Sequence, residues 1–376
     1  MPSLIESKLP IKERILNLNW QLISSLFLLA ILGLIMLFSA AGGEFKPWLV
    51  RQIIYVFAFF SIMILIAIID IRFWFKTCYL GYFIGLVLLA IVDIKGHNSM
   101  GATRWVKFAG LTIQPSEMTK LFTVMALAKY FYTIDAENIG KTRYVAVSLL
   151  IIFTPALLIL NQPDLGTAMI VVLAGASVLF VAGVKAWKFI VGGILALIAI
   201  PFLWLFVLYD YQKNRILTFL NPDADPTGAG YNIIQSKIAI GSGGFFGKGY
   251  LNGTQGQLDF LPERQTDFIF TMLSEEMGFI GSITIIALFL WIIHLGTQIS
   301  IKSKNQFGKL LAAGIVNIFF LQMFINMGMV MGILPVVGTP LPLISYGGTM
   351  TATILVAFGL LLNVDLHHNT ESRLNA

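Results

Sequence analysis

The segment 310–364 is the feature that most constrains this chain, because 55 consecutive residues contain no Asp, Glu, Lys or Arg. One helix across a bilayer core needs about 20 apolar residues, so the segment is too long for a single span. Pro335, Pro340 and Pro342 divide it into two parts. The segment therefore predicts two transmembrane helices joined by a proline-rich turn.

Composition extends this prediction to the whole chain of 376 residues. Hydrophobic residues make up 57% and charged residues only 12%, whereas soluble domains carry about 25% charged residues. This composition excludes a disordered chain, and the single cysteine, Cys78, excludes a disulfide scaffold. The net charge of +6 does not indicate nucleic-acid binding, because most basic residues lie in short segments between apolar runs.

The predicted fold is an all-α polytopic membrane protein with about ten transmembrane helices. It forms one membrane domain over residues 1–376, with one long extracytoplasmic loop, 210–266. The predicted spans are approximately 19–41, 48–70, 75–93, 114–133, 144–162, 165–184, 187–208, 268–299, 308–333 and 342–365.

The distribution of Lys and Arg predicts the orientation, since these residues favour the cytoplasmic side of short loops. With the N-terminus inside, the inner segments hold fourteen basic residues and the short outer loops hold five. An even number of spans returns the C-terminus to the same side. Both termini are therefore expected to be cytoplasmic.

Ionisable side chains inside membrane spans are costly and mark functional candidates. Glu117 and Lys120 fall within one predicted span at a spacing of i, i+3, so they can face each other on a helix. They predict either an internal ion pair or polar groups of a cavity. Just before this span, Arg104 and Lys107 flank Trp105, either as interface anchors or as cations that hold a phosphate.

Two short connections on the outer side carry further polar groups. In the hairpin 161–167, Asp164 either caps the next helix or forms a polar wall of an outer cavity. The turn 336–349 contains Ser345 and is rich in proline and glycine. Irregular backbone at membrane depth has to be buried in protein or line a cavity, so a re-entrant or packed turn is expected.

The loop 210–266 is unusually long for a connection between spans, and loops of that length without function are uncommon. Its glycine-rich run 241–249 does not match a phosphate-binding P-loop, because Lys248 is followed by Gly249. Candidate polar residues in the loop are Arg215, Gln235, Ser236 and Lys237.

Carboxylates concentrate where this loop meets the next span. They are Glu263, Asp267, Glu275 and Glu276, and the basic Arg264 lies among them. Thr266 or Asp267 could cap the helix. Alternatively, Asp267 at the mouth of an apolar cavity fits a general base. Together with the cations on the same predicted side, these groups suggest one outward-facing site for a diphosphate with a lipid tail.

The motifs resemble the SEDS family (shape, elongation, division and sporulation proteins) along nearly the whole chain. The matching blocks are Arg104-Trp105, Gln114-Pro-Ser-Glu117 with Lys120, Gln162-Pro-Asp-Leu-Gly-Thr167, Arg215 with Asn221-Pro222 and Asp225-Pro226, Gly230-Tyr-Asn232, Gln235-Ser236, Pro262-Glu263 with Thr266-Asp-Phe-Ile-Phe270, and Ile344-Ser-Tyr-Gly-Gly-Thr349. Gly247-Lys-Gly249 and Gly253-Thr-Gln255 are more similar to the elongation branch than to the division paralogue.

The resemblance implies a peptidoglycan glycosyltransferase of the bacterial cytoplasmic membrane that polymerises lipid II during cell elongation and controls rod shape. The essential acidic residue of the family falls on Asp267. Gln265 stands where the family often has His, so this position is expected to be structural. The expected diphosphate-binding residues are Arg104, Lys107, Arg215, Gln235, Ser236, Lys237 and Arg264. The expected cavity residues are Glu117, Lys120, Asp164, Glu263, Glu276 and Ser345.

An α-linked donor and a β-linked product would imply a single inverting displacement, which needs a base but no glycosyl-enzyme intermediate. No metal-ligand spacing occurs in the sequence, although Mg²⁺ or Mn²⁺ could assist the leaving diphosphate. The resemblance also implies a partner, a class B penicillin-binding transpeptidase of the elongation complex. A lipid II flippase and a scaffold without chemistry are the alternatives.

Overall fold

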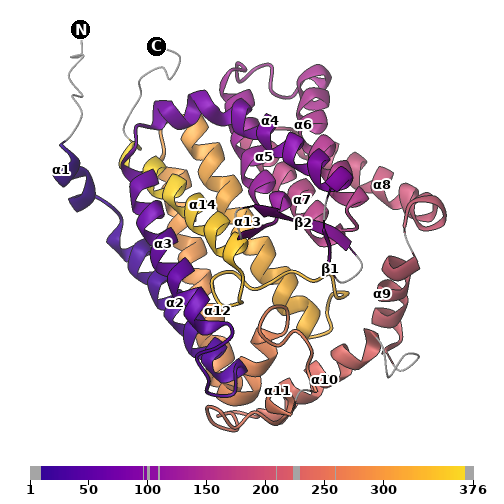
Figure 1. The fold of residues 1–376 in the computed structure, drawn as a ribbon. Coiled ribbons are helices and arrows are strands. Elements are labelled where there is room, and N and C mark those ends of the chain that lie inside the picture. Colours follow the sequence, from indigo (N-terminus) through magenta and orange to yellow (C-terminus); the bar gives the residue numbers. More distant parts are fainter. Residues whose placement is uncertain are drawn as a thin grey trace.

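The computed structural model describes residues 10–95, 97–99, 102–108, 111–208, 210–222, 229–258 and 260–368. It shows a bundle of long helices (Figure 1). The helices are α1 (Ile11–Leu16), α2 (Trp20–Ala40), α3 (Leu49–Ile68), α4 (Ile71–Lys95), α5 (Pro115–Tyr132), α6 (Thr142–Asn161), α7 (Leu165–Ala182), α8 (Ala186–Phe202), α9 (Asp210–Leu220), α10 (Ala229–Ser242), α11 (Thr254–Gln257), α12 (Ile269–Lys302), α13 (Gln306–Val330) and α14 (Gly348–Leu366). A π-helical turn, Leu203–Val207, extends α8.

Among the described residues, nine helices are long and apolar enough to cross a membrane. They are α2, α3, α4, α6, α7, α8 with its π-helical turn, α12, α13 and α14. The predicted span 114–133 corresponds to α5, which carries Glu117, Lys120 and Lys129 and is largely buried among its neighbours. The chain is a multi-pass helical membrane protein, as predicted. The span boundaries and the orientation stay predictions.

A small sheet departs from the all-α prediction. Between α4 and α5, the strands β1 (His97–Ser99), β2 (Ala102–Phe108) and β3 (Leu111–Ile113) form an antiparallel sheet in the order β1-β2-β3. β2 is rich in the β-branched and aromatic residues that favour strands. A search for spans about 20 residues long does not detect a strand of seven. The predicted loop 210–266 likewise contains α9, α10 and α11.

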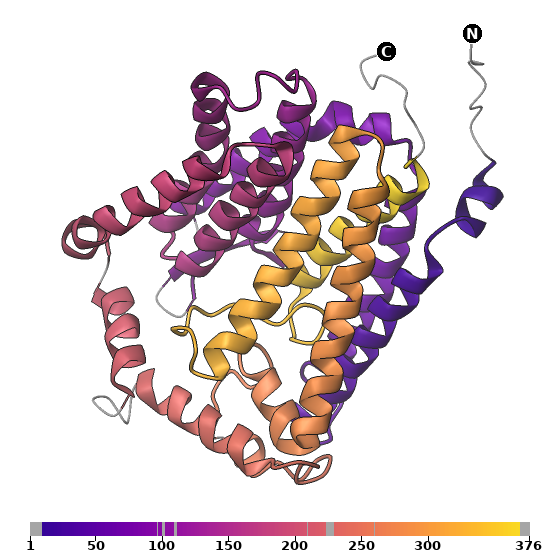
Figure 2. The same cartoon turned by 180° about the vertical axis from the view of Figure 1, so that it is seen from behind.

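α13 and α14 form the middle of the bundle (Figure 2), and most of their residues are buried. α13 packs against α12, α7 and α5, and α14 packs against α3. α8 has no buried residue and stands at the rim of the bundle. Because every residue of α8 after Lys188 is uncharged and most are apolar, such exposure suits lipid rather than water.

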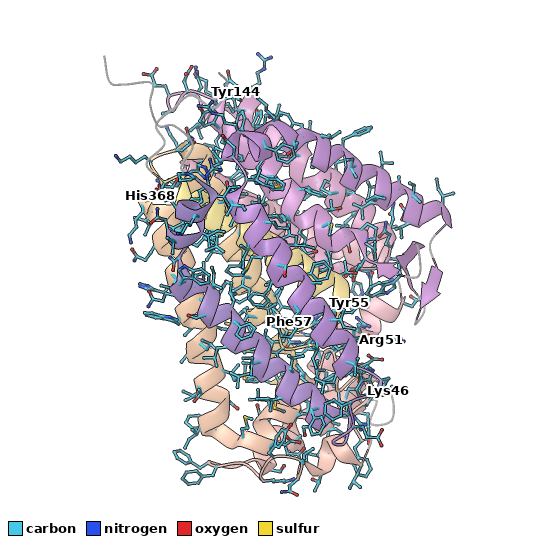
Figure 3. The ribbon with its side chains drawn as sticks, turned by 60° about the vertical axis from the view of Figure 1, so that its left-hand side comes forward. Lys46, Arg51, Tyr55, Phe57, Tyr144 and His368 are labelled. Atoms are coloured by element: carbon cyan, nitrogen blue, oxygen red, sulfur yellow. The ribbon has the colours of Figure 1, made fainter. Side chains whose placement is uncertain are left out.

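α5, α7, α12 and α14 all begin at one end of the bundle, which we call the loop end. Several contacts bring these helix starts together; for example, the Gln114 amide before α5 donates to Thr349 Oγ1 in α14 at 3.4 Å. In Figure 3, Lys46 and Arg51 lie toward this end, whereas Tyr144 and His368 lie at the opposite end. The predicted outer motifs therefore share one end of the molecule.

Candidate active site

The 335–347 segment, which connects α13 to α14, is a packed turn inside the loop end. Residues 341–345 are buried, and α2 approaches them closely at Gly33. A Cβ atom on Gly33 would lie 2.7 Å from Ile344 Cα. This contact explains how irregular backbone is tolerated within a membrane bundle, since protein covers it.

Asn326, in α13, joins this segment to the residues that precede α12. Its Nδ2 donates to the carbonyl oxygen of Asp267 at 2.9 Å and to that of Thr339 at 2.7 Å. Asn326 is fully buried but is not among the predicted site residues. The available signal was an amide side chain inside an apolar span, where polar groups are rare and are usually satisfied by the protein.

Ser345 and Tyr346 make the second connection. The Ser345 hydroxyl donates to Thr266 O at 2.6 Å and accepts from the Leu341 amide at 2.7 Å. The Tyr346 amide donates to Gln265 O at 2.8 Å. Ser345 thus holds backbone at the loop end, and Gln265 takes part through its carbonyl group.

Asp267 is half-buried and lies against Gly338. Gly338 has a φ of +73°, and a Cβ atom placed there would be 3.3 Å from Asp267 Oδ2. The N-cap residue of α12 is Phe268, so Asp267 stands one position before the cap and does not occupy the capping position considered from the sequence. Nearby, Glu263 Oε2 accepts from the Thr266 hydroxyl at 2.9 Å.

Gly338→Ala is expected to lower both stability and activity. A non-glycine residue at this positive φ costs about 1–2 kcal/mol, and the added methyl group would press on the Asp267 carboxylate. Gly183→Ala is the matched control, because Gly183 has a φ of +106° with nothing within 4 Å of its Cβ position. The melting temperature should fall in both variants, and the enzymatic activity should fall only in Gly338→Ala. Equal rates in both would contradict the contact.

A small pocket next to this region brings three predicted blocks together. It is lined by Pro163, Leu165, Gln212, Arg215, Ile216, Pro335, Val336 and Val337. Gly166 supports its wall, because a Cβ atom on Gly166 would lie 3.2 Å from Val337 O. Residues 335–338 thus border both the pocket with Arg215 and the carboxylate of Asp267.

Asp164 caps α7, one of the two roles considered for it. Its side chain accepts from the Thr167 amide at 3.2 Å and from the Thr167 hydroxyl at 2.9 Å. It also accepts from Gln114 Nε2 at 3.1 Å, which ties α7 to the start of α5. Asp164 is buried, so it organises the loop end in this conformation.

Glu117 and Lys120 form a buried ion pair in α5. Lys120 Nζ lies 2.8 Å from Glu117 Oε1, and Gln322 Nε2 donates to Glu117 Oε2 at 3.5 Å. Both charged residues are less than one-tenth exposed. The pair is therefore part of the helix interior between α5 and α13.

Two predicted diphosphate ligands hold neighbouring segments together. Arg264 Nε donates to Ala40 O at 2.8 Å, and its Nη1 donates to Gly256 O. The buried Ser236 hydroxyl donates to Val330 O at 2.8 Å and lies 2.7 Å from Thr271 Oγ1. In this conformation Arg264 connects α2 to α11, and Ser236 connects α10 to α12 and α13.

The remaining predicted ligands lie elsewhere at the loop end. Arg215 lines the pocket, Gln235 is half-buried, and Lys237 is exposed beside Gly332. The predicted ligands Arg104 and Lys107 belong to β2, and their side chains lie outside the described part of the structure. Lys46 and Arg51 add two exposed cations near this end, which the sequence suggested only as topology signals (Figure 3).

Glu275 and Glu276 are buried at the loop end of α12. Glu275 Oε1 accepts from Lys248 Nζ at 2.7 Å and from the Thr254 amide and hydroxyl, each at 2.9 Å. Glu276 Oε1 accepts from the Ser39 hydroxyl at 2.5 Å. These contacts make the two carboxylates anchors for α2 and the loop before α11, a role with no distinct signal in the sequence.

Tyr250 adjoins these carboxylates. Burial raises the pKa of its phenol, and the nearby Glu276 carboxylate raises it further. The Tyr250 hydroxyl donates to Ile35 O at 2.8 Å. Across the described residues, no group of three or more His, Cys, Asp and Glu side chains is arranged to hold a metal ion. The Mg²⁺ or Mn²⁺ considered from the sequence stays a prediction.

Known proteins give an independent comparison. The chain is 41% identical over 352 residues to the peptidoglycan glycosyltransferase MrdB of Escherichia coli K12, covering 93% of this chain and 94% of MrdB. It is 38% identical to a probable peptidoglycan glycosyltransferase FtsW of Geobacter metallireducens, covering 88% and 90%.

Solved structures agree with this likeness. One solved structure concerns the structural coordination of polymerization and crosslinking by a peptidoglycan synthase complex. A chain in that structure matches this chain with a TM-score of 0.82 and 30% sequence identity, and the match covers 95% of this chain and all of the other. The rod shape determining protein RodA of Thermus thermophilus gives 0.72 at 26% identity, over 95% and 99%. The sequence profile of the cell cycle proteins FtsW, RodA and SpoVE matches residues 19–370. The chain therefore belongs to the FtsW/RodA/SpoVE family of cell cycle proteins.

Proposed function

We propose that this chain is a peptidoglycan glycosyltransferase that polymerises lipid II at the outer face of the bacterial cytoplasmic membrane, with Asp267 as general base. The observation that carries the proposal is the position of Asp267. Its carboxylate lies beside Gly338, and residues 335–337 line the pocket that contains Arg215. With both termini in the cytoplasm, the loop end faces outward, where the glycan strand is built.

The proposed reaction is a single displacement. The 4-hydroxyl group of the acceptor sugar attacks the anomeric carbon of the donor, and the bond from that carbon to the polyprenyl diphosphate breaks. Asp267 takes the proton of the attacking hydroxyl group, which is the task of a general base. A single displacement inverts the anomeric centre and needs no covalent sugar-enzyme intermediate.

The leaving diphosphate needs positive charge. Arg215 lies in the wall of the pocket and Lys237 is exposed at the loop end, so both are proposed to neutralise the diphosphate. Arg104 and Lys107 complete the proposed set from the sequence. The starts of α5, α7 and α14 add the positive ends of helix dipoles, which favour anions.

We assign the chain to the elongation branch rather than the division branch. Its identity to MrdB exceeds that to the FtsW relative, 41% against 38%, and Gly247-Lys-Gly249 fits the elongation pattern. The related chain from a peptidoglycan synthase complex supports a crosslinking partner, which we propose to be a class B penicillin-binding transpeptidase of the elongation complex.

Arg215→Gln is expected to raise the KM for lipid II about 10- to 100-fold, because a hydrogen bond to a charged group contributes about 1.5–3 kcal/mol. Lys213→Gln is the matched control, since Lys213 lies on the same helix and pairs weakly with Asp210 at 3.9 Å, outside the pocket. Initial rates at varied lipid II concentration measure the effect. An equal KM in the two variants would remove Arg215 from the diphosphate site.

The function itself is tested with purified chain and lipid II, with and without the transpeptidase. Glycan strands resolved by length support the polymerase. A parallel assay follows labelled lipid II across vesicle membranes. Movement of lipid II without strands would replace the proposal by the transport alternative. If the chain together with its partner gives neither strands nor movement of lipid II, the proposal is refuted.

A further inference from the structure

The glycine-rich run 241–249 wraps around a break in α12. At the break, Gly278 has a φ of +65°, and a Cβ atom there would lie 2.8 Å from Phe245 O. The Phe279 amide donates to Gly244 O at 3.0 Å, and the Ile280 amide donates to Phe245 O at 3.2 Å. The carbonyl groups of the run thus accept hydrogen bonds from two α12 amides that lose their helical acceptors at the break.

The same run is fixed at its other end. The Lys248 amide donates to Glu275 O at 3.0 Å, and the Gly249 amide donates to Glu276 O at 3.1 Å. The Lys248 ammonium group turns to the Glu275 carboxylate, 2.7 Å away. Within the turn, the Gly247 amide donates to Gly243 O at 2.8 Å. The carbonyl groups of residues 243–245 and the amides of residues 247–249 are therefore paired within the protein.

Two phenylalanines at the tip of the run point outward. Phe246 is 77% exposed and Phe245 is 58% exposed. The Phe245 ring stacks on the exposed Phe279 of α12, with centroids 5.8 Å apart. Ile280 and Ile283 continue this exposed apolar surface along α12. Residues 241–247 contain no charged side chain, so the patch is apolar up to the Lys248 ammonium group.

The length of α12 places this patch relative to the membrane. From Ile280 to Lys302 the helix comprises 23 residues, and the distance between these two residues along the axis is about 33 Å at a rise of 1.5 Å per residue. The hydrocarbon core is about 30 Å thick, and Lys302 at the far end suits the opposite interface. Phe279 and Ile280 therefore lie at the boundary between hydrocarbon and headgroups, together with the two phenylalanines clamped beside them.

We propose that Phe245 and Phe246 insert into the lipid leaflet at the loop end as a wedge clamped to α12. Lipid is the occupant that fits, because the patch continues the outer apolar face of a membrane-spanning helix at the depth of the interface. The pairing of the carbonyl groups of residues 243–245 with α12 and within the turn lowers the cost of a non-helical segment at this depth. The wedge fixes how far the loop before Asp267 stands above the membrane. The proposal about the wedge does not depend on whether the chain polymerises glycan.

Nitroxide labelling tests the wedge. The background is Cys78→Ser, where Ser can still donate to Trp74 O as Cys78 does. Phe246→Cys carries the label in phosphatidylglycerol and phosphatidylethanolamine nanodiscs. Ile283→Cys on the exposed face of α12 is the lipid reference, and Glu137→Cys in the exposed connection after α5 is the aqueous reference.

Power-saturation spectra compare collisions with oxygen, which concentrates in lipid, and with a water-soluble nickel chelate. The wedge predicts an oxygen-to-nickel ratio at position 246 that matches Ile283→Cys and exceeds Glu137→Cys. It also predicts that, with the label moved to Ser242→Cys, replacing both phenylalanines by Ser lowers that ratio. A ratio at 246 equal to the aqueous reference, or shielding from both reagents by a second protein surface, would overturn the proposal.

Discussion

Asp267→Asn is expected to slow lipid II polymerisation about 100- to 10,000-fold, the range that a positioned general base contributes. The amide keeps the size of the carboxylate and its fit beside Gly338, but it cannot take a proton from the attacking hydroxyl group. Folding should be unchanged, because Asn326 holds Asp267 through its backbone carbonyl group. Initial rates and thermal melting in the same detergent measure the two effects separately.

Glu263→Gln is the control for this experiment. Glu263 lies four residues earlier and accepts from the Thr266 hydroxyl, a contact that Gln retains with its amide oxygen. We expect the polymerisation rate of Glu263→Gln to stay within a few-fold of the wild type. If Asp267→Asn kept the full rate, Asp267 would not be the base, and Glu117, Asp164 and Glu263 would be the next candidates.

Lys120→Met is expected to lower the free energy of unfolding by about 3–5 kcal/mol, the cost of leaving one member of a buried ion pair unpaired. Met occupies a similar volume, but Glu117 would lose its partner at 2.8 Å and retain only the long hydrogen bond from Gln322. Thermal melting followed by tryptophan fluorescence should show the loss.

The double variant Glu117→Gln with Lys120→Met separates charge from packing. It removes both charges, so stability should recover most of the loss, as apolar or neutral replacements of buried ion pairs often do. Stability of the double variant no better than that of Lys120→Met would show that packing around Lys120, rather than its charge, is what matters. Polymerisation by the recovered double variant would assign the pair a structural role; a folded but inactive double variant would place it in the chemistry.

Asn326 and Arg264 show which parts of the site could not be predicted from the sequence. Asp267, Arg215 and Ser345 stand out in the sequence, because charged or polar motifs at span ends are unusual in an apolar chain. Asn326 carries no charge and is one of several amides in α13, so its position in the sequence gives only a weak signal. From the sequence, Arg264 was interpreted as an anion ligand. In the structure it instead donates to the carbonyl oxygens of Ala40 and Gly256. Those partners lie 224 and 8 residues away.

The sequence by itself determined the helical membrane fold and the identity of the motifs, because span length and hydropathy are local properties. It also indicated that the polar motifs share one side. Only the tertiary structure decided which groups meet: Asp267 against Gly338, Glu275 with Lys248, and the glycine-rich run against the break at Gly278. These contacts join residues distant in sequence, and hydrogen bonding and close backbone packing select them only after the helices assemble.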